Sequence, residues 1–321
     1  MLENQENEIM QKLVLIDGNA ILHRAFHALP PLTSKDGKMI NAVYGFFSML
    51  FKILEDQKPD YLIVCFDRPK PTFRKALYVG YQAKRPKMSD DLIPQIVTVH
   101  ELLEKIKIDV FEVDGYEADD LIGTIATQAV EGKLDGGLDV IIVTGDRDML
   151  QLVNSHVKVL APIIGITKMI LFDEAKVVEK YGLKPSQFVD YKALVGDQSD
   201  NYPGVTGIGP KTASEILKKL GTLENAYKNL GELAPKVVEK LSTDAEQAML
   251  AKKLATIVTD APITLDLERC AVSRFDIEGF KKALGVLGFK SLLKRIEGRA
   301  SEDGSAGKEK VEKNSNQMKL L

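Results

Sequence analysis

Short apolar runs rich in β-branched residues recur in the first half of the chain and alternate with helical patterns. Three of them predict buried strands, at 13–16, 61–66 and 140–143, and a weaker fourth lies at 110–113. Apolar residues at helical spacing occupy 42–54, 92–106 and 118–130. This alternation predicts an α/β fold with a mostly parallel central sheet flanked by helices.

The second half of the chain has a different pattern. After about residue 185 the strand signals fade, and short helical stretches separated by Gly and Pro predict a helical lobe over 186–298. The α/β core then spans 1–185 and includes a basic segment at about 68–92. Residues 299–321 are rich in Ser, Gly, Lys and Glu, and we expect a disordered tail there.

The composition fits an ordinary globular protein. With 321 residues, 45% of them apolar, the chain can bury a sizeable core. No apolar run approaches the roughly 20 residues that cross a bilayer, and the N-terminus lacks the pattern of a signal peptide. We therefore expect a cytoplasmic protein with no membrane partner. Cys65 and Cys270 are expected to be reduced packing residues.

Charge is distributed unevenly along the chain. The net charge of −3 argues weakly against a protein that coats nucleic acid by bulk electrostatics. The segment 68–89, however, contains no acidic residue and seven basic ones: Arg68, Lys70, Arg74, Lys75, Lys84, Arg85 and Lys87.

Acidic residues gather after the predicted strands and in one later loop. The five clusters, LIDGN, VCFDRP, GYEADD, TGDRD and GDQSDN, contain Asp17, Asp67, Glu117, Asp119, Asp120, Asp146, Asp148, Asp197 and Asp200. Parallel strands present their carboxyl ends at one edge, so these side chains should converge. Carboxylates so close raise each other's pKa unless cations lie between them, and Mg²⁺ prefers such oxygen ligands.

A single acidic cluster is better explained as a turn or a helix cap. Five clusters together favour a metal site. Two Mg²⁺ ions about 3.5 to 4 Å apart can bind the attacking water and the leaving oxygen of phosphodiester hydrolysis.

A glycine-rich segment, PGVTGIGPKTASEIL, predicts a turn before a helix that starts near Pro210. Gly207, Gly209, Lys211 and Thr212 would hold a backbone phosphate at the free amides of the helix N-terminus. The segment resembles a helix-hairpin-helix motif, which binds duplex DNA without reading its bases. A plain tight turn between helices explains the same residues equally well.

The five acidic clusters, followed by GDQSDNYPGVTGIGPKTA, resemble the 5′ nuclease domain of bacterial DNA polymerase I and related flap endonucleases. The resemblance runs from about Val14 to about Leu293 and implies a PIN-like core, a helical arch and a helix-hairpin-helix. It assigns Asp17, Asp67, Glu117, Asp119 and Asp120 to the first metal's neighbourhood. It assigns Asp146, Asp148, Asp197 and Asp200 to the second's.

The basic stretch TFRKALYVGYQAKRPKM matches the arch of that family, whose cations draw in a single-stranded 5′ flap. By resemblance, Arg74 and Arg85 would contact the scissile phosphate, and Lys75 and Tyr81 would contact DNA. Many family members carry Lys directly after the tyrosine that corresponds to Tyr81. This chain has Gln82 there, and Lys84 is the candidate substitute for the missing cation.

These features together predict a structure-selective 5′-to-3′ exonuclease and flap endonuclease that acts on flaps, nicks and RNA-primer remnants in replication and repair. Its expected cofactors are two Mg²⁺ ions, with Mn²⁺ as a substitute, and K⁺ at the hairpin. A separate polymerase and ligase are expected partners. No polymerase region follows the nuclease-like part, which fits a free-standing enzyme or a truncated polymerase.

Two other functions remain open at this point. A non-catalytic DNA-junction binding protein would keep the arch and the hairpin, but the full acidic set argues against it. A PIN-like ribonuclease would share the acidic α/β core, but it gives no reason for the long basic segment and the hairpin.

Overall fold

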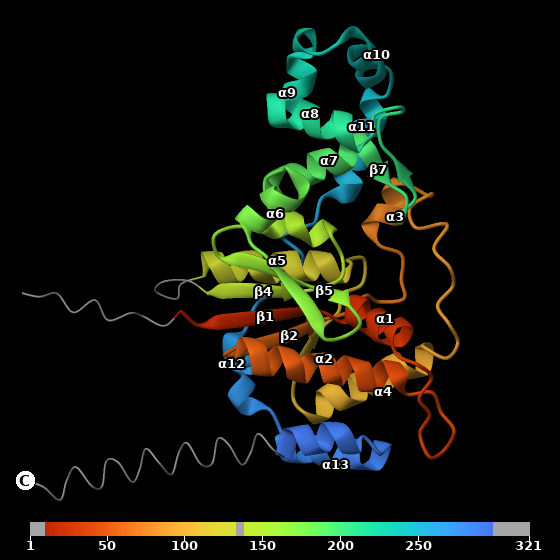
Figure 1. Cartoon of the computed structure of the whole chain (residues 1–321), viewed down its shortest axis with the longest axis vertical. Helices are drawn as coiled ribbons and strands as arrows, with labels where there is room; N and C mark the ends of the chain where they lie inside the picture. Colours follow the sequence, from red (N-terminus) through yellow and green to blue (C-terminus); the bar gives the residue numbers. More distant parts are fainter. Residues whose placement is uncertain (1–9, 133–137, 298–321) are drawn as a thin grey trace, which may run out of the picture.

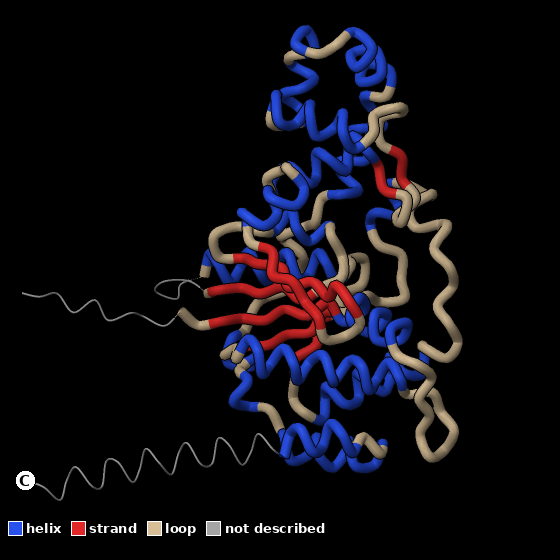
Figure 2. The backbone as a smooth tube through the Cα atoms, in the orientation of Figure 1, coloured by secondary structure: helices blue, strands red, loops and turns tan. Residues whose placement is uncertain are grey.

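The computed structural model describes residues 10–132 and 138–297, and a six-stranded sheet forms its centre (Figures 1 and 2). The strand order is β3-β2-β1-β4-β5-β6, and all neighbours pair in parallel except β5 and β6. The strands are β1 (Lys12–Asp17), β2 (Tyr61–Cys65), β3 (Asp109–Phe111), β4 (Asp139–Val143), β5 (Val157–Ile164) and β6 (Lys168–Phe172).

The central strand β1 is buried on both faces. Leu13 and Leu15 belong to one apolar cluster, whereas Val14 and Ile16 belong to another on the opposite face. Side chains of a strand alternate between faces, so the continuous apolar run in this segment follows from burial on both sides. β1 pairs with β2 and β4, which places the carboxyl ends of all three at one edge.

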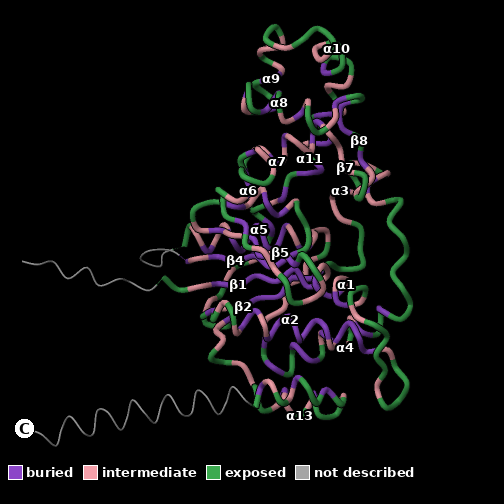
Figure 3. Tube along the Cα trace, viewed as in Figure 1, coloured by how far each residue is buried: buried purple, intermediate pink, exposed green. Residues whose placement is uncertain are grey.

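Helices cover both faces of the sheet (Figure 1). One face packs against α1 (Gly18–Ala28), α2 (Asn41–Gln57) and α4 (Ile93–Lys105), and α13 (Ile277–Leu287) packs on the outer side of α2 and α4. The other face packs against α5 (Ala118–Glu131). The buried trace in Figure 3 is concentrated in the sheet and in these helices.

The apolar cluster on the α5 face continues into a helical lobe beyond the sheet. Ile216, Leu217 and Ala248 belong to the same cluster as Leu13 and Leu15. The lobe contains α7 (Phe188–Val195), α8 (Pro210–Leu220), α9 (Leu223–Lys228), α10 (Pro235–Thr243) and α11 (Ala245–Ala255), and α6 (Glu174–Tyr181) lies between it and the sheet (Figure 1). The shorter elements are α3 (Phe73–Leu77), η1 (Asp148–Leu152), η2 (Pro185–Gln187), β7 (Gly196–Asp197), β8 (Tyr202–Pro203), η3 (Leu230–Glu232), α12 (Leu267–Cys270) and η4 (Val272–Arg274).

The predicted α/β class is confirmed, since the four predicted strands form β1 to β4 and the three predicted helices form α2, α4 and α5. Two features differ. The sequence did not indicate β5 and β6, and α13 packs on the core instead of joining the helical lobe. The predicted tail at 299–321 lies outside the described residues.

The predicted helical arch is helical only over α3. Residues 78–92 form turns and extended backbone, and this loop is exposed along much of its length (Figure 3). Gly80, Pro86 and the left-handed backbone of Gln82 (φ 55°) oppose a continuous helix.

Two further observations concern the chain as a whole. Cys65 and Cys270 are free thiols buried in the core, as predicted. Across the described ranges, every helix is too short or too polar to cross a membrane.

Candidate metal centre and DNA interface

The first two acids lie where β1 and β2 end. Asp17 caps the N-terminus of α1, because its Oδ1 accepts from the Ala20 amide (2.9 Å), and its Oδ2 accepts from the Thr144 hydroxyl (2.7 Å). Asp67 Oδ1 accepts from the Ala118 amide at the start of α5 (2.7 Å). Each carboxylate is thus held by a neighbouring strand end or helix start, at the carboxyl edge of the sheet.

A buried arginine organises the acids at the start of α5. Arg74 is 1% exposed and makes two hydrogen bonds of 2.7 Å to the two oxygens of Asp120. Asp120 also accepts from the amides of Glu117 (3.1 Å) and Val258 (2.9 Å). Arg74 further donates to the carbonyls of Leu254 and Thr256, which ties α3 to the chain after α11.

A second acidic group lies between η1 and the β7–β8 hairpin. Carboxylate oxygens of Asp148, Asp197 and Asp200 all lie within 4.8 Å of one another. The Lys192 ammonium of α7 lies 2.6 Å from Asp148 Oδ1 and also pairs with Asp197. Arg85 lies 2.6 Å from Asp200 Oδ1. Each of the three acids therefore faces a cation from this chain.

Tyr81 connects the two acidic groups. Its hydroxyl lies 3.0 Å from Glu117 Oε2 and 3.3 Å from Asp200 Oδ2. Backbone contacts fix the same turn to the β7–β8 hairpin, since the Gln82 amide donates to the Asp200 carbonyl (2.8 Å) and Asn201 donates to Gly80 (2.7 Å). The base of the basic segment is therefore docked directly on the second acidic group.

Burial and mutual repulsion disfavour the charged forms of these acids. Burial raises the pKa of Asp17 to about 7, and the charges of Asp67 and Asp146 add to the effect. Burial, followed by repulsion from Asp146, raises the pKa of Asp148 to about 7. The pKa values of Asp67, Glu117 and Asp119 are also raised by burial. A cation placed among these acids would favour their charged forms.

Asp197 behaves differently. Burial opposes its ionisation, but the hydrogen bonds from Lys192 and Ser199 hold its pKa below the usual value. The Lys192 ammonium thus favours the charged form of Asp197, and a metal ion would favour the charged forms of the neighbouring acids in the same way.

The residues present fit divalent metal ions. Asp148 Oδ1 is buried 2.6 Å from Lys192, yet it makes no well-directed hydrogen bond. Hard carboxylate oxygens grouped within one coordination sphere suit Mg²⁺ or Mn²⁺. Asp120 fits less well, because protein donors already occupy both of its oxygens. The geometry therefore gives Asp120 a structural role.

The glycine-rich turn precedes α8 as predicted, with Pro210 in the first turn. Gly207 has φ 76°, a conformation that favours glycine, while the buried Ile208 anchors the turn. A Cβ on Gly209 would meet nothing within 4 Å. Lys211 is exposed beside it. The amides at the start of α8 are thus open to an anion.

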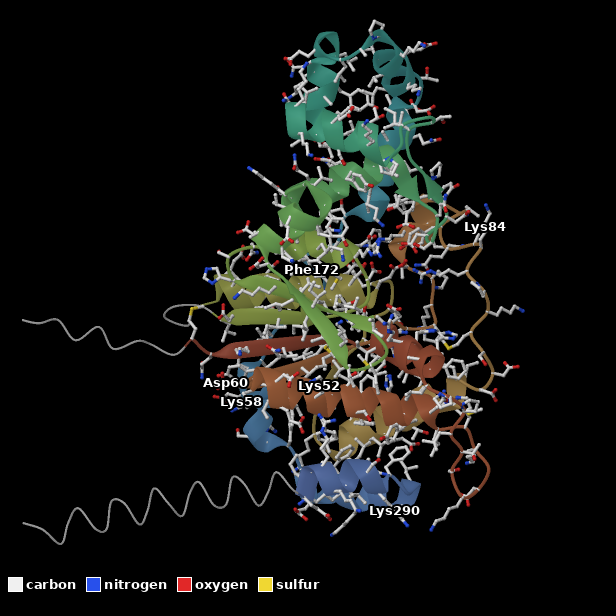
Figure 4. All side chains as sticks on the ribbon, in the orientation of Figure 1. Lys52, Lys58, Asp60, Lys84, Phe172 and Lys290 are labelled. Atoms are coloured by element: carbon white, nitrogen blue, oxygen red, sulfur yellow. The ribbon has the colours of Figure 1, made fainter. Side chains whose placement is uncertain are left out.

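Several residues that were predicted to contact DNA are bonded to other groups of the protein in this structure. Arg74 is paired with Asp120, and Lys75 donates to the Tyr81 carbonyl (2.7 Å). Tyr81 is itself buried. Lys84, in contrast, is exposed on the loop between α3 and α4 (Figure 4). The predicted phosphate and DNA contacts of these residues stay predictions.

Sequence reasoning missed two residues that shape the site. Lys192 lies within FVDYKALV, and a lone cation in a largely apolar helix next to an acidic loop was the available signal. Thr144 orients Asp17 and accepts from the Asp146 amide (2.9 Å), but a threonine after a strand has no distinctive pattern.

A mostly parallel sheet with acids converging at its carboxyl edge, joined to a helical lobe with a glycine-rich turn, is the arrangement of the α/β class of metal-dependent nucleases. Two family models match consecutive parts of the chain. Residues 12–182 match the N-terminal resolvase-like domain of 5′-3′ exonucleases, and residues 183–278 match their C-terminal SAM fold. The chain belongs to the 5′-3′ exonuclease family.

Individual relatives agree with this assignment. A 5′-3′ exonuclease of Aquifex aeolicus is 40% identical over 288 residues, which cover 90% of this chain and 96% of that protein. DNA polymerase I of Caldicellulosiruptor bescii is 44% identical over 287 residues, 89% of this chain and 33% of the polymerase. The chain thus spans about a third of the polymerases that it matches.

Solved structures share the fold at low sequence identity. The T5 D15 protein co-crystallised with metal ions has a TM-score of 0.66 and 20% identity, covering 86% of this chain and 100% of that chain. The catalytic core of Rad2 in complex with DNA substrate has a TM-score of 0.53 and 18% identity, covering 87% of each chain.

Proposed function

We propose that this chain hydrolyses phosphodiester bonds of DNA at 5′ flaps, nicks and free 5′ ends, using two Mg²⁺ ions, in replication and repair. The grouping of Asp148, Asp197 and Asp200 beside the base of the basic segment carries this proposal. Family membership supports it. RNA-primer remnants are proposed substrates, with a separate polymerase and ligase as partners.

The acids divide into two groups in this mechanism. Asp17, Asp67 and Asp119 would hold one ion, with Glu117 beside them, and Asp146, Asp148, Asp197 and Asp200 would hold the other. When bound, the two ions would activate water and stabilise the charge that develops on the phosphate. The carboxylates of this chain supply the negative charge that keeps both ions close together.

The cations of this chain have separate tasks in the proposal. Arg85 and Lys84 would contact the scissile phosphate and offset its developing charge. Arg85 must leave Asp200 to do so, and its 49% exposed side chain has room to move. Arg74 would act as a positioning residue, because its donors already hold Asp120 and the chain after α11.

Gly207, Gly209, Lys211 and Thr212 would hold the duplex through its phosphates. We leave K⁺ at this turn out of the proposal, because the Lys240 ammonium donates to the Gly207 carbonyl (2.7 Å) and gives that oxygen a cationic partner.

We place the enzyme in the cytoplasm, where a reducing environment suits the buried thiols of Cys65 and Cys270.

The test uses 5′-labelled flap, nicked and single-stranded DNA with Mg²⁺ or with EDTA. The wild type should cut the flap in Mg²⁺ and leave it intact in EDTA. Asp146→Asn combined with Asp148→Asn should lower the rate by about a thousandfold or more. Flap binding should persist or tighten, because two negative charges near the phosphate are gone.

A charge-matched control is Glu101→Gln with Glu104→Gln, an exposed pair in the last turns of α4, which leads into the start of β3. It should cut at the wild-type rate. Flap binding without cleavage in any metal would instead support a DNA-junction binding protein. Faster cleavage of an RNA flap than of a DNA flap would support a ribonuclease.

A further inference from the structure

Lys192 occupies an unusual position for a lysine of a largely buried helix. It extends from α7 toward the second acidic group, and its side chain is only 20% exposed. Its ammonium contacts both Asp148 at the start of η1 and Asp197 in β7. No other lysine or arginine in the described residues pairs with these two acids.

The ammonium and a divalent ion would compete for the same oxygens. Mg²⁺ binds carboxylate oxygen at about 2.0 to 2.1 Å. An ammonium 2.6 Å from Asp148 Oδ1 leaves no room for an ion at that oxygen and repels one nearby. A lysine has a flexible stem, so the ammonium can move aside when a more highly charged ion arrives.

We propose that Lys192 is a built-in counter-ion that competes with the second divalent ion and so sets the metal concentration at which this site fills. In the metal-free protein the ammonium offsets the repulsion between Asp148 and Asp197. When metal binds, the ammonium leaves these oxygens. This role rests on the metal site of the proposed function and adds to it a residue that tunes metal affinity.

Lys192→Met tests this role, because methionine keeps an unbranched apolar stem and removes the charge. Mn²⁺ titration of the full chain without DNA, followed by the electron paramagnetic resonance signal of free Mn²⁺, reports affinity without relying on activity. The weaker of the two Mn²⁺ dissociation constants should fall by about tenfold in Lys192→Met, since a competing positive charge is gone. The melting temperature in EDTA should fall.

Lys252→Met is a matched control. Lys252 of α11 pairs with the buried Asp190 of α7 (2.6 Å) and with Glu224, and both acids lie outside the second acidic group. This variant also loses one positive charge and one buried ion pair, so its melting temperature should fall. Its Mn²⁺ affinities should remain those of the wild type.

Lys192→Arg keeps the charge and should bind the second Mn²⁺ no more tightly than the wild type. The proposal is overturned if Lys192→Met binds the second Mn²⁺ with unchanged or weaker affinity than the wild type. It is also overturned if Lys192→Arg binds the second Mn²⁺ about tenfold more tightly, as expected only for the uncharged Lys192→Met. Should Lys192→Met not fold without metal, Lys192→Gln takes its place with the same expectation. If the wild type binds no Mn²⁺, the metal site of the proposed function is refuted. If the wild type and Lys192→Met bind Mn²⁺ equally, only the role of Lys192 is refuted.

Discussion

At the scale of single residues, the buried acids at the sheet edge destabilise the fold when they are charged, and the same charges would bind metal ions. Asp17 is 8% exposed, and its pKa is raised to about 7 mainly by burial. A carboxylate that only capped α1 would lie in solvent, as Asp173 does at the start of α6. The buried position is explained if a cation shares it.

Asp17→Asn should stabilise the metal-free protein at pH 8 and do so much less at pH 5. The folded pKa of about 7 exceeds the usual 3.8, so the folded state holds a proton that the unfolded state releases. The unfolding free energy due to Asp17 therefore falls as the pH rises from about 4 to about 7. The gain at pH 8 should be about 1 to 4 kcal/mol, measured by denaturant unfolding in EDTA.

Asp173→Asn provides the comparison, because Asp173 also caps a helix through its side chain but is exposed. Its effect on the unfolding free energy is measured at the same two pH values. Equal effects of Asp17→Asn at pH 5 and pH 8 would show that the charge of Asp17 carries no penalty.

Gln82 lies where the resemblance to the 5′ nucleases predicts a lysine. With its amide oxygen turned toward Arg85, that oxygen lies 3.2 Å from Arg85 Nη2, so position 82 adjoins a proposed phosphate contact. Gln82→Lys should raise the single-turnover rate on a saturating flap by roughly tenfold, through stabilisation of developing charge. The left-handed backbone at position 82 is one that Lys58 and Lys107 also adopt.

If Gln82→Lys leaves the rate unchanged, Lys84→Ala should cause a large loss, because the Lys84 ammonium would already serve the phosphate. Unchanged rates in Gln82→Lys, Lys84→Ala and Arg85→Ala would remove the catalytic role of this segment. It would then only gather the flap electrostatically.

The acids of the first four clusters could be predicted from the sequence, because each cluster follows a strand or opens a helix. Their partners could not. Asp120 and Arg74 lie 46 positions apart, and their two-fold hydrogen bonding depends on how α3 packs against α5. Lys192 and Asp148 lie 44 positions apart, and their contact depends on how α7 packs against η1.

At the scale of elements, the proposed DNA contact of the turn before α8 can be separated from folding. Lys211→Ala and Gly209→Val should each weaken duplex binding, by about tenfold at low salt, and to the same degree for every sequence. A side chain at Gly209 meets nothing within 4 Å, so its effect falls on an approaching phosphate and not on the fold. Binding measured on two unrelated duplexes checks this.

Lys253→Ala is a suitable control, because Lys253 is an exposed lysine of α11. A loss of binding by the turn variants that depends on base sequence would contradict a contact limited to phosphates.

Elements with clear periodicity, such as α2 and β1, could be predicted well from the sequence. β5 and β6 were missed, and β6 is an edge strand whose apolar residues are only partly buried, apart from Phe172. The arch loop was also misjudged. Its backbone follows its docking on the β7–β8 hairpin, and local helical spacing in 78–92 cannot reveal that contact.

At the scale of the whole molecule, one continuous apolar cluster joins the sheet to the helical lobe. The turn before α8 is therefore held in a fixed relation to the acidic edge, as expected if one substrate contacts both. The basic loop between α3 and α4 runs along the side of the molecule from the level of the β7–β8 hairpin down to α4 (Figure 1). Duplex binding by the lobe and cleavage at the edge would then concern a single DNA.

The central claim is that the carboxyl edge of the sheet holds two catalytic ions, and anomalous diffraction from a Mn²⁺-soaked crystal tests it most directly. The account predicts two peaks about 3.5 to 4 Å apart. One should lie among Asp148, Asp197 and Asp200, and the other beside Asp17, Asp67 and Asp119. No peak at this edge at saturating Mn²⁺, or a peak only elsewhere on the molecule, would contradict the account.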